Sequence, residues 1–177
     1  MSVLSTLSLW IDRLNERVGR FIAWAALFMV LMQFVVVILR YVFAWGMIPL
    51  QESIWYSHGI LFMVAAGYTL LYDGHVRVDI IYREARSKTK AWIDLLGTLL
   101  FLLPVCTVGW MVSWGYVLNS WRVREGSTEA SGLQTIFLLK TVIPIFLILL
   151  ALQGISLAIK SLKVLREGDG QTQTSHT

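Results

Sequence analysis

The chain has 177 residues, of which 56% are hydrophobic and 15% are charged, and its formal net charge is +4. A typical soluble domain carries about 25% charged residues, so this composition, gathered in long apolar blocks, indicates a membrane protein with one compact domain. The Lys and Arg residues lie in short segments between the apolar blocks, which suits a bilayer and argues against nucleic acid as a partner. The single cysteine, Cys106, cannot form an internal disulfide.

The first predicted element is an amphipathic helix over residues 1–20. Apolar side chains recur there at helical spacing, and charged and amide side chains occupy the other faces. We expect this helix to lie in the plane of the membrane interface with its apolar side towards the lipid. Packing against another subunit is a compatible alternative.

Four apolar blocks follow, and each is long enough to cross a hydrocarbon core of about 30 Å as a helix of about 20 residues. The predicted spans cover about residues 21–43, 53–72, 92–118 and 133–159. They form an all-α transmembrane domain over residues 21–166. Gly74 is expected to end the second span as a helix C-terminal glycine. Pro104 predicts a kink in the third span, and Pro144 lies inside the fourth. The polar residues 167–177 predict a disordered cytoplasmic tail.

The basic residues predict the orientation of these spans. With four crossings, one side of the membrane holds eleven of them, namely Arg13, Arg17, Arg20, Arg77, Arg83, Arg86, Lys88, Lys90, Lys160, Lys163 and Arg166. The other side holds four, namely Arg40, Arg122, Arg124 and Lys140. Because basic residues concentrate on the cytoplasmic side, both termini are predicted to be cytoplasmic.

The sequence offers no recognisable reaction centre. It contains no phosphate-binding glycine loop, no paired metal-ligand motif and no serine, histidine and acid arrangement in a familiar context. We therefore expect neither an enzyme nor a bound cofactor. His58 and His75 are separated by about 25 Å along a helix, too far to ligate one haem iron within a monomer. A membrane anchor of a respiratory enzyme that binds haem or quinone remains the alternative function.

Three charged residues fall at similar depth near the outer ends of the spans. Lys140 lies about two turns into the fourth apolar block, and its depth matches that of Arg40 and Glu52. We hypothesise a polar cluster of these three side chains, because isolated charge in lipid is unfavourable. Three independently solvated interfacial charges are the equal alternative.

A combination of short motifs gives the chain a family resemblance. Arg40, Tyr41 and Phe43 close the first span, Pro49 and Glu52 open the second, and Gly74, His75, Val78 and Asp79 follow it. In this combination the chain resembles the small membrane subunit, the Q subunit (DctQ-like), of tripartite ATP-independent periplasmic (TRAP) transporters. Many members carry two acids where this chain has Gln51 and Glu52.

The resemblance implies a division of labour in a bacterial inner membrane. A large membrane subunit, the M subunit, would carry the substrate and sodium sites and move like an elevator. A periplasmic substrate-binding protein, the P subunit, would deliver an organic acid through transient contacts. The small subunit would be non-catalytic, would scaffold the large subunit among the membrane lipids, and would help to dock the binding protein.

We expect the residues that matter to lie at subunit interfaces or to support the structure. Small residues such as Gly67 and Gly109 allow close contact between helices. The candidates are Arg40, Tyr41, Glu52, Trp55, Gly67, Gly74, His75, Asp79, Gly109, Lys140 and Pro144.

Overall fold

The computed structural model of the chain describes residues 3–76, 82 and 84–170, with the side chains described as far as residue 167. All of its long elements are helical. They are α1 (Val3–Ile22), α2 (Trp24–Tyr41), α3 (Ile48–Val64), α4 (Ala66–Leu71), α6 (Ser87–Gly97), the π-helical turn η1 (Thr98–Leu102), α7 (Leu103–Val123) and α8 (Ile136–Gly170).

These helices join into four stretches that are long and apolar enough to cross a membrane. The stretches are Val3–Tyr41, Ile48–Leu71, Ser87–Val123 and Ile136–Glu167. The prediction of four spans is therefore confirmed. Each stretch exceeds the 20 or so residues that a bilayer requires, so part of each extends past the hydrocarbon core.

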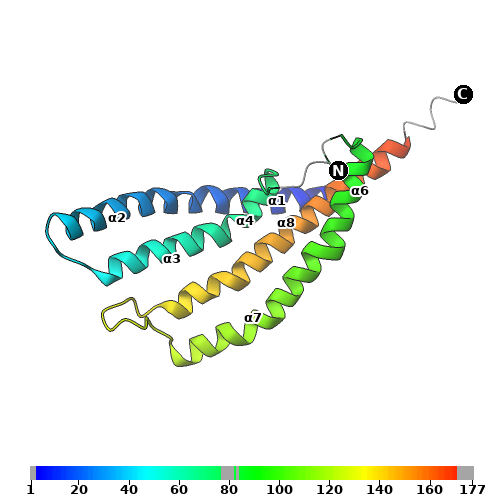
Figure 1. Cartoon of the computed structure of the whole chain (residues 1–177). Coiled ribbons are helices and arrows are strands. Elements are labelled where there is room, and N and C mark those ends of the chain that lie inside the picture. Colours follow the sequence, from blue (N-terminus) through cyan, green and yellow to red (C-terminus); the bar gives the residue numbers. More distant parts are fainter. Residues whose placement is uncertain (1–2, 77–81, 83, 171–177) are drawn as a thin grey trace, which may run out of the picture.

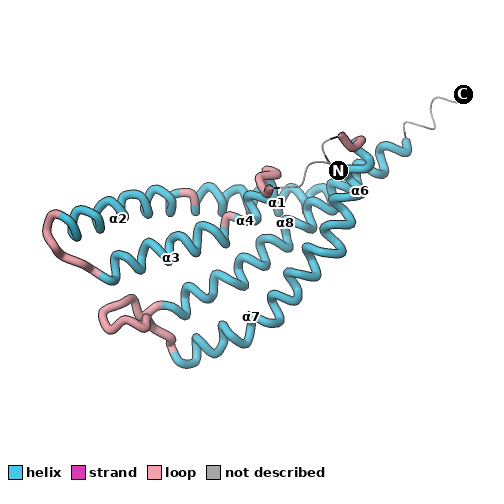
Figure 2. The backbone as a smooth tube through the Cα atoms, viewed as in Figure 1, coloured by secondary structure: helices cyan, strands magenta, loops and turns pink. Residues whose placement is uncertain are grey.

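Towards the loops of residues 42–47 and 124–135 the four spans form a row and not a closed bundle, whereas at the other end α1, the first half of the first span, packs against α8 and α4. α2 packs on α3, α3 packs on α8, and α8 packs on α7. Figures 1 and 2 show these helices side by side in this order, with α2 and α7 at the two edges. The loops of residues 42–47 and 124–135 lie together at one end of the row, which we call the hairpin end. We call the opposite end, where both chain termini lie, the terminal end.

α8 is the central element of the fold. At the terminal end it packs against α1, α4, α6 and η1, in addition to its neighbours in the row. Most of the buried core residues of the described chain belong to α8 or contact it, among them Leu147, Leu149 and Ala158. By contrast, α2 contains no buried residue in the described structure. The row is therefore stiffest around α8 and most exposed at its edges.

The amphipathic stretch predicted over residues 1–20 does not form a separate helix. α1 continues into α2 through Ala23, which keeps helical dihedral angles of −57° and −28° and donates its N–H to Gly19 O at 3.0 Å. The combined helix of 39 residues is about 58 Å long at helical rise.

The burial of the two sides of α1 explains why the prediction of a separate interfacial helix was wrong. Val3, Trp10 and Phe21 on its apolar side are exposed, whereas the more polar side, with Ser8 and Asn15 beside Ile11, is buried against the rest of the chain. In a membrane protein an apolar stripe can face lipid. The periodicity of the stripe therefore did not reveal that the polar side is the one that packs.

The irregularity expected at Pro104 appears as a π-helical turn. Pro104 has no N–H to donate to the carbonyl one turn earlier, and the preceding turn widens so that Leu103 donates its N–H to Thr98 O. The helix from α6 to α7 curves at this place in Figure 1. Pro144 lies inside α8, which stays continuous through it.

Two helix ends differ from the prediction. Asp73, with φ of 57°, takes the left-handed position at the end of α4, and no described glycine has a positive φ. Gly74 is the next residue and donates its N–H to Thr69 O at 2.8 Å, which closes a Schellman motif. α8 continues to Gly170, into the segment predicted to be disordered, and residues 171–177 lie outside the described chain.

Candidate functional site

At the hairpin end, a buried carboxylate fastens the loop of residues 124–135 to α3. Glu52, in the second turn of α3, is 8% exposed. It accepts hydrogen bonds from the Ser127 hydroxyl and from the Leu133 N–H, the second at 2.5 Å. The Tyr56 hydroxyl donates to Leu133 O at 3.4 Å. Because a buried carboxylate needs donors around it, Glu52 fixes the path of this loop.

Lys140 fastens the same loop to α8. Its Nζ lies 2.5 Å from Glu125 Oε2 and 3.9 Å from the centre of the Tyr116 ring, and its side chain is 13% exposed. Lys140 therefore holds an ion pair and a cation–π contact together. The hydrogen bond from Lys140 lowers the pKa of the Glu125 carboxyl below its ordinary value.

The predicted cluster of Arg40, Glu52 and Lys140 is replaced by separate contacts. Glu52 and Lys140 bind different parts of one loop, through Ser127 and Glu125 respectively. Arg40 lies apart, between α2 and α3. The prediction that the three residues lie at similar depth agrees with their position at the same end of the row. It did not reveal that the loop itself supplies the partners.

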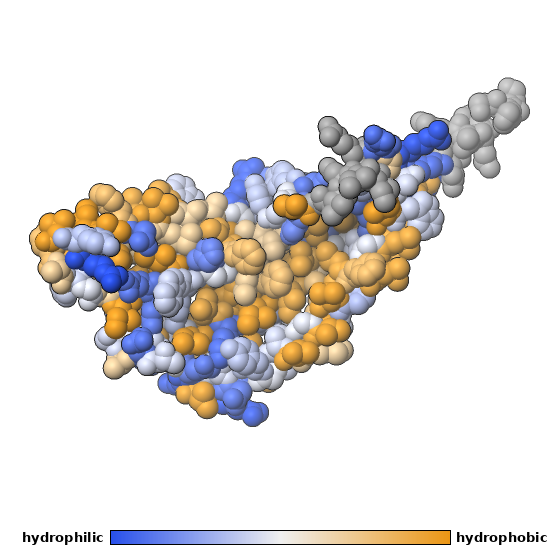
Figure 3. Space-filling view, in the orientation of Figure 1, coloured by the Kyte–Doolittle hydropathy of each residue, from blue (hydrophilic) through white to orange (hydrophobic). Residues whose placement is uncertain are grey.

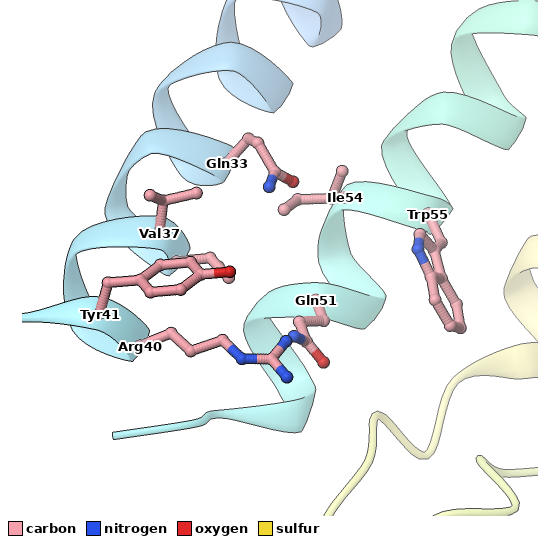
Figure 4. A pocket seen from close by; sticks show the side chains of 8 residues that line it. Gln33, Val37, Arg40, Tyr41, Gln51, Ile54 and Trp55 are labelled. Carbon is pink, nitrogen blue, oxygen red and sulfur yellow. The ribbon is translucent and has the colours of Figure 1, made fainter. Parts of the chain in front are cut away.

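Arg40 lines a cleft between α2 and α3 at the hairpin end. The cleft has a volume of about 290 Å³, and its other lining residues include Gln33, Tyr41, Gln51 and Trp55. Figure 4 shows Gln33 and Arg40 reaching from α2 towards Ile54 and Gln51 on α3. Within the described residues, the side chains of Gln33, Arg40 and Gln51 make no hydrogen bond or ion pair. The cleft therefore presents unused donors beside apolar walls.

At the terminal end, a polar seam joins α1 to α8. Asp12 lies at its centre, with Oδ2 2.7 Å from Lys160 Nζ and Oδ1 2.7 Å from the Ser156 hydroxyl. Gln153 donates to Asp12 Oδ1 at 3.0 Å and accepts from Asn15 Nδ2 at 3.0 Å. The residues of this seam are absent from the candidate residues named from the sequence. The sequence feature that could have indicated the seam is the polar stripe of α1 together with the polar side chains of Gln153 and Lys160 on α8.

Two of the candidate glycines lie where helices approach closely. A Cβ on Gly67 would collide with the Asn15 side chain and lie 3.2 Å from Leu149 O. A Cβ on Gly109 would lie 3.1 Å from the Leu147 side chain. Both glycines therefore face helices of this chain, α1 and α8 for Gly67 and α8 for Gly109.

The remaining candidates lie apart from these contacts. Trp55 is exposed on α3, and Tyr41 is exposed at the end of α2. His75 is exposed beyond the end of α4. Asp79 lies outside the described residues.

The surface of the row is mainly apolar. Figure 3 shows hydrophobic side chains over most of the middle of one face, with hydrophilic side chains gathered towards its two ends. The exposed large apolar residues concentrate on the two edge helices, for example Phe34 on α2 and Val112 on α7. The arrangement can anchor and pack against other molecules in a membrane. The polar contacts described above hold loops and helices together.

Comparison with known proteins agrees with this reading. No curated protein and no solved structure matches the chain. One protein family matches residues 29–164, and its description is "Tripartite ATP-independent periplasmic transporters, DctQ component". The match covers all four apolar spans from the middle of the first onwards, which is most of the chain. The protein therefore belongs to the DctQ family and is a non-catalytic, multi-pass membrane component of a TRAP transporter.

Proposed function

We propose that this chain is the frame of a sodium-coupled TRAP importer for an organic acid, and that it holds the large, elevator-type subunit in the membrane. The single-layer row formed by α2, α3, α8 and α7 carries this proposal. A row of helices buries little of its own apolar surface, as α2 demonstrates, and leaves both edges free for a neighbour. A moving domain needs a fixed body beside it, and α8 with its seam to α1 stiffens the row in the direction of the spans.

Cysteine cross-linking between this chain and the large subunit tests the frame. Native Cys106 is buried, so it gives little background. We expect single cysteines at Val30 on α2 or at Val112 on α7, both exposed, to cross-link to the large subunit in assembled complexes. Cysteine at Leu149, which is buried on α8, is the matched control. Absence of cross-links from both edges, in complexes that co-purify, would contradict an edge-on frame.

We further propose that the hairpin end faces the periplasm of a bacterial inner membrane, that both termini are cytoplasmic, and that the loop of residues 124–135 helps to dock the substrate-binding protein. The basic-residue asymmetry supports the orientation. Arg122 lies just before this loop and Arg124 is its first residue, and both are exposed. Glu52 and Lys140 hold the loop in place.

Transport measurements test the docking role. In liposomes that contain the whole membrane complex, Arg122→Glu should lower uptake that depends on the binding protein, because it reverses a charge at the proposed contact. Lys163→Glu, an exposed charge reversal at the terminal end, should leave uptake unchanged. Equal uptake by both variants would remove Arg122 from the docking surface and leave the frame proposal standing.

A further inference from the structure

We propose that the cleft between α2 and α3 binds the headgroup of an anionic phospholipid, with Arg40 holding its phosphate. The cleft lies at the hairpin end of two adjacent spans and has a volume of about 290 Å³. This inference concerns a ligand from the bilayer itself and does not depend on the role proposed for the chain in transport.

The charge of the cleft is uncompensated. Arg40 makes no ion pair in the described part of the chain. The acid nearest to the cleft in sequence, Glu52, is already occupied by Ser127 and Leu133 of the neighbouring loop. A guanidinium group is weakly hydrated, and its planar donors match the oxygens of a phosphate. An anion is therefore the ligand that this cleft fits.

The polar groups are spaced along the direction in which a lipid lies. Arg40 and Gln51 lie at the end of the cleft near the loop of residues 42–47, which we call its mouth, whereas Gln33 lies two helical turns further along α2. Two turns correspond to about 10 Å. A phospholipid presents its phosphate first and its ester carbonyls deeper, so Arg40 meets the phosphate and the Gln33 amide meets an ester. Val37 and Ile54 supply apolar walls for the acyl chain.

The aromatic residues place the mouth at the membrane boundary. Tyr41 and Trp55 both line the cleft, and they are 80% and 71% exposed. Tyr and Trp collect at the level of the lipid headgroups because each ring has an apolar body and a polar tip. A guanidinium group within such a belt, in a recess between two spans, lies at the depth of lipid phosphates and can pair with one of them. A soluble anion would use the mouth alone and would leave the Gln33 amide and the apolar walls without a partner.

The test uses the full chain, purified in detergent and stripped of lipid, and palmitoyl-oleoyl-phosphatidylglycerol as the probe. Native mass spectrometry measures retained lipid. We expect Arg40→Gln to weaken binding by about tenfold or more, because a charge-assisted contact is lost. Gln51→Leu should weaken it less. Arg122→Gln removes an exposed arginine at the same end of the row, outside the cleft, and should bind like the unmodified chain.

Three results would overturn the proposal. One is equal lipid retention by Arg40→Gln and Arg122→Gln. A second is equal binding of palmitoyl-oleoyl-glycerol, which has the same acyl chains and no phosphate. A third is competition by free glycerol phosphate at the concentrations at which the lipid binds, which would assign the site to a soluble phosphate. If the first result is accompanied by loss of co-purification of Arg40→Gln with the large subunit, Arg40 pairs with a carboxylate of that protein instead.

Discussion

Glu52 carries more of the structure than its position at the start of a helix would suggest. Its carboxylate accepts two hydrogen bonds from a loop more than seventy residues away in sequence. A buried hydrogen-bond network of this kind is sensitive to the loss of any one member. The loop of residues 124–135 therefore depends on one carboxylate of α3 and on one ammonium group of α8.

We expect Glu52→Gln to loosen this loop. The Gln amide can accept from the Leu133 N–H and donate to the Ser127 hydroxyl, but a neutral amide holds these groups less strongly than a carboxylate does. The free energy of unfolding should therefore fall by about 1 kcal/mol. Hydrogen exchange of residues 124–135 and thermal unfolding measure the effect. Glu129→Gln, at an exposed position in the same loop, is the matched control. Equal exchange rates in the two variants would contradict the anchoring role.

The ion pair of Lys140 predicts a dependence on pH. Because the hydrogen bond from Lys140 lowers the pKa of Glu125 in the folded chain, the unfolded chain binds the proton more readily. The pair thus stabilises the fold fully above the unfolded pKa of about 4.3, and this contribution is lost as pH falls through the lower folded pKa. Thermal unfolding of the unmodified chain and of Glu125→Gln should differ at neutral pH and converge in acid. A difference that persists unchanged at low pH would exclude this pair as its source.

Two glycines provide a matched test of close helix packing. A Cβ at Gly67 meets Asn15 and a backbone carbonyl of α8, whereas a Cβ at Gly97 meets nothing within 4 Å. Gly67→Ala should therefore lower the free energy of unfolding by about 1–3 kcal/mol. Gly97→Ala should be neutral or stabilising by up to about 1 kcal/mol, since alanine favours a helix. Thermal unfolding distinguishes them, and a neutral Gly67→Ala would show that α1 and α8 can separate at this point.

At the scale of elements, the seam between α1 and α8 determines where the N-terminal helix lies. It pairs Asp12 and Asn15 of α1 with Gln153, Ser156 and Lys160 of α8 at the terminal end. Such a seam aligns two long helices in one register, because a shift of one turn would separate donors from acceptors.

Gln153→Leu should break the seam at its centre. The change removes the bonds to Asp12 and Asn15, and hydrogen bonds between membrane helices contribute about 0.6 kcal/mol each, with a maximum near 1.7. We expect unfolding in lipid-free detergent to shift to lower denaturant concentration. Gln33→Leu, the same change at an exposed amide on α2, should cause no shift. If both variants unfold alike, the seam contributes nothing beyond packing.

The sequence predicted some of these elements and not others, for physical reasons. The four spans were predictable because a bilayer sets the length of an apolar helix. The placement of α1 was not, because an apolar stripe such as Val3, Leu7 and Trp10 can face lipid as well as protein. The partners of Glu52 and Lys140 were hidden because they come from an irregular loop, including one backbone N–H, and hydrophobic periodicity carries no information about such contacts.

At the scale of the whole molecule, the arrangement in a row predicts which residues are reachable from each side of the membrane. Gly46 lies in the loop of residues 42–47, where a Cβ meets nothing within 4 Å, and Lys163 is exposed at the terminal end. In intact cells, cysteine at position 46 should react with a membrane-impermeant maleimide. Cysteine at position 163 should react only after permeabilisation. The opposite pattern would reverse the proposed orientation without altering the fold.

The exposed edges of the row also affect the steady-state abundance of the protein in the cell. A copy without its partner exposes the apolar surfaces of α2 and α7 in the membrane, and quality-control proteases degrade such unassembled subunits. We expect its abundance to follow that of the large subunit, so that surplus copies are degraded soon after synthesis. In this way the geometry of a single layer would set the stoichiometry of the complex without any dedicated regulator.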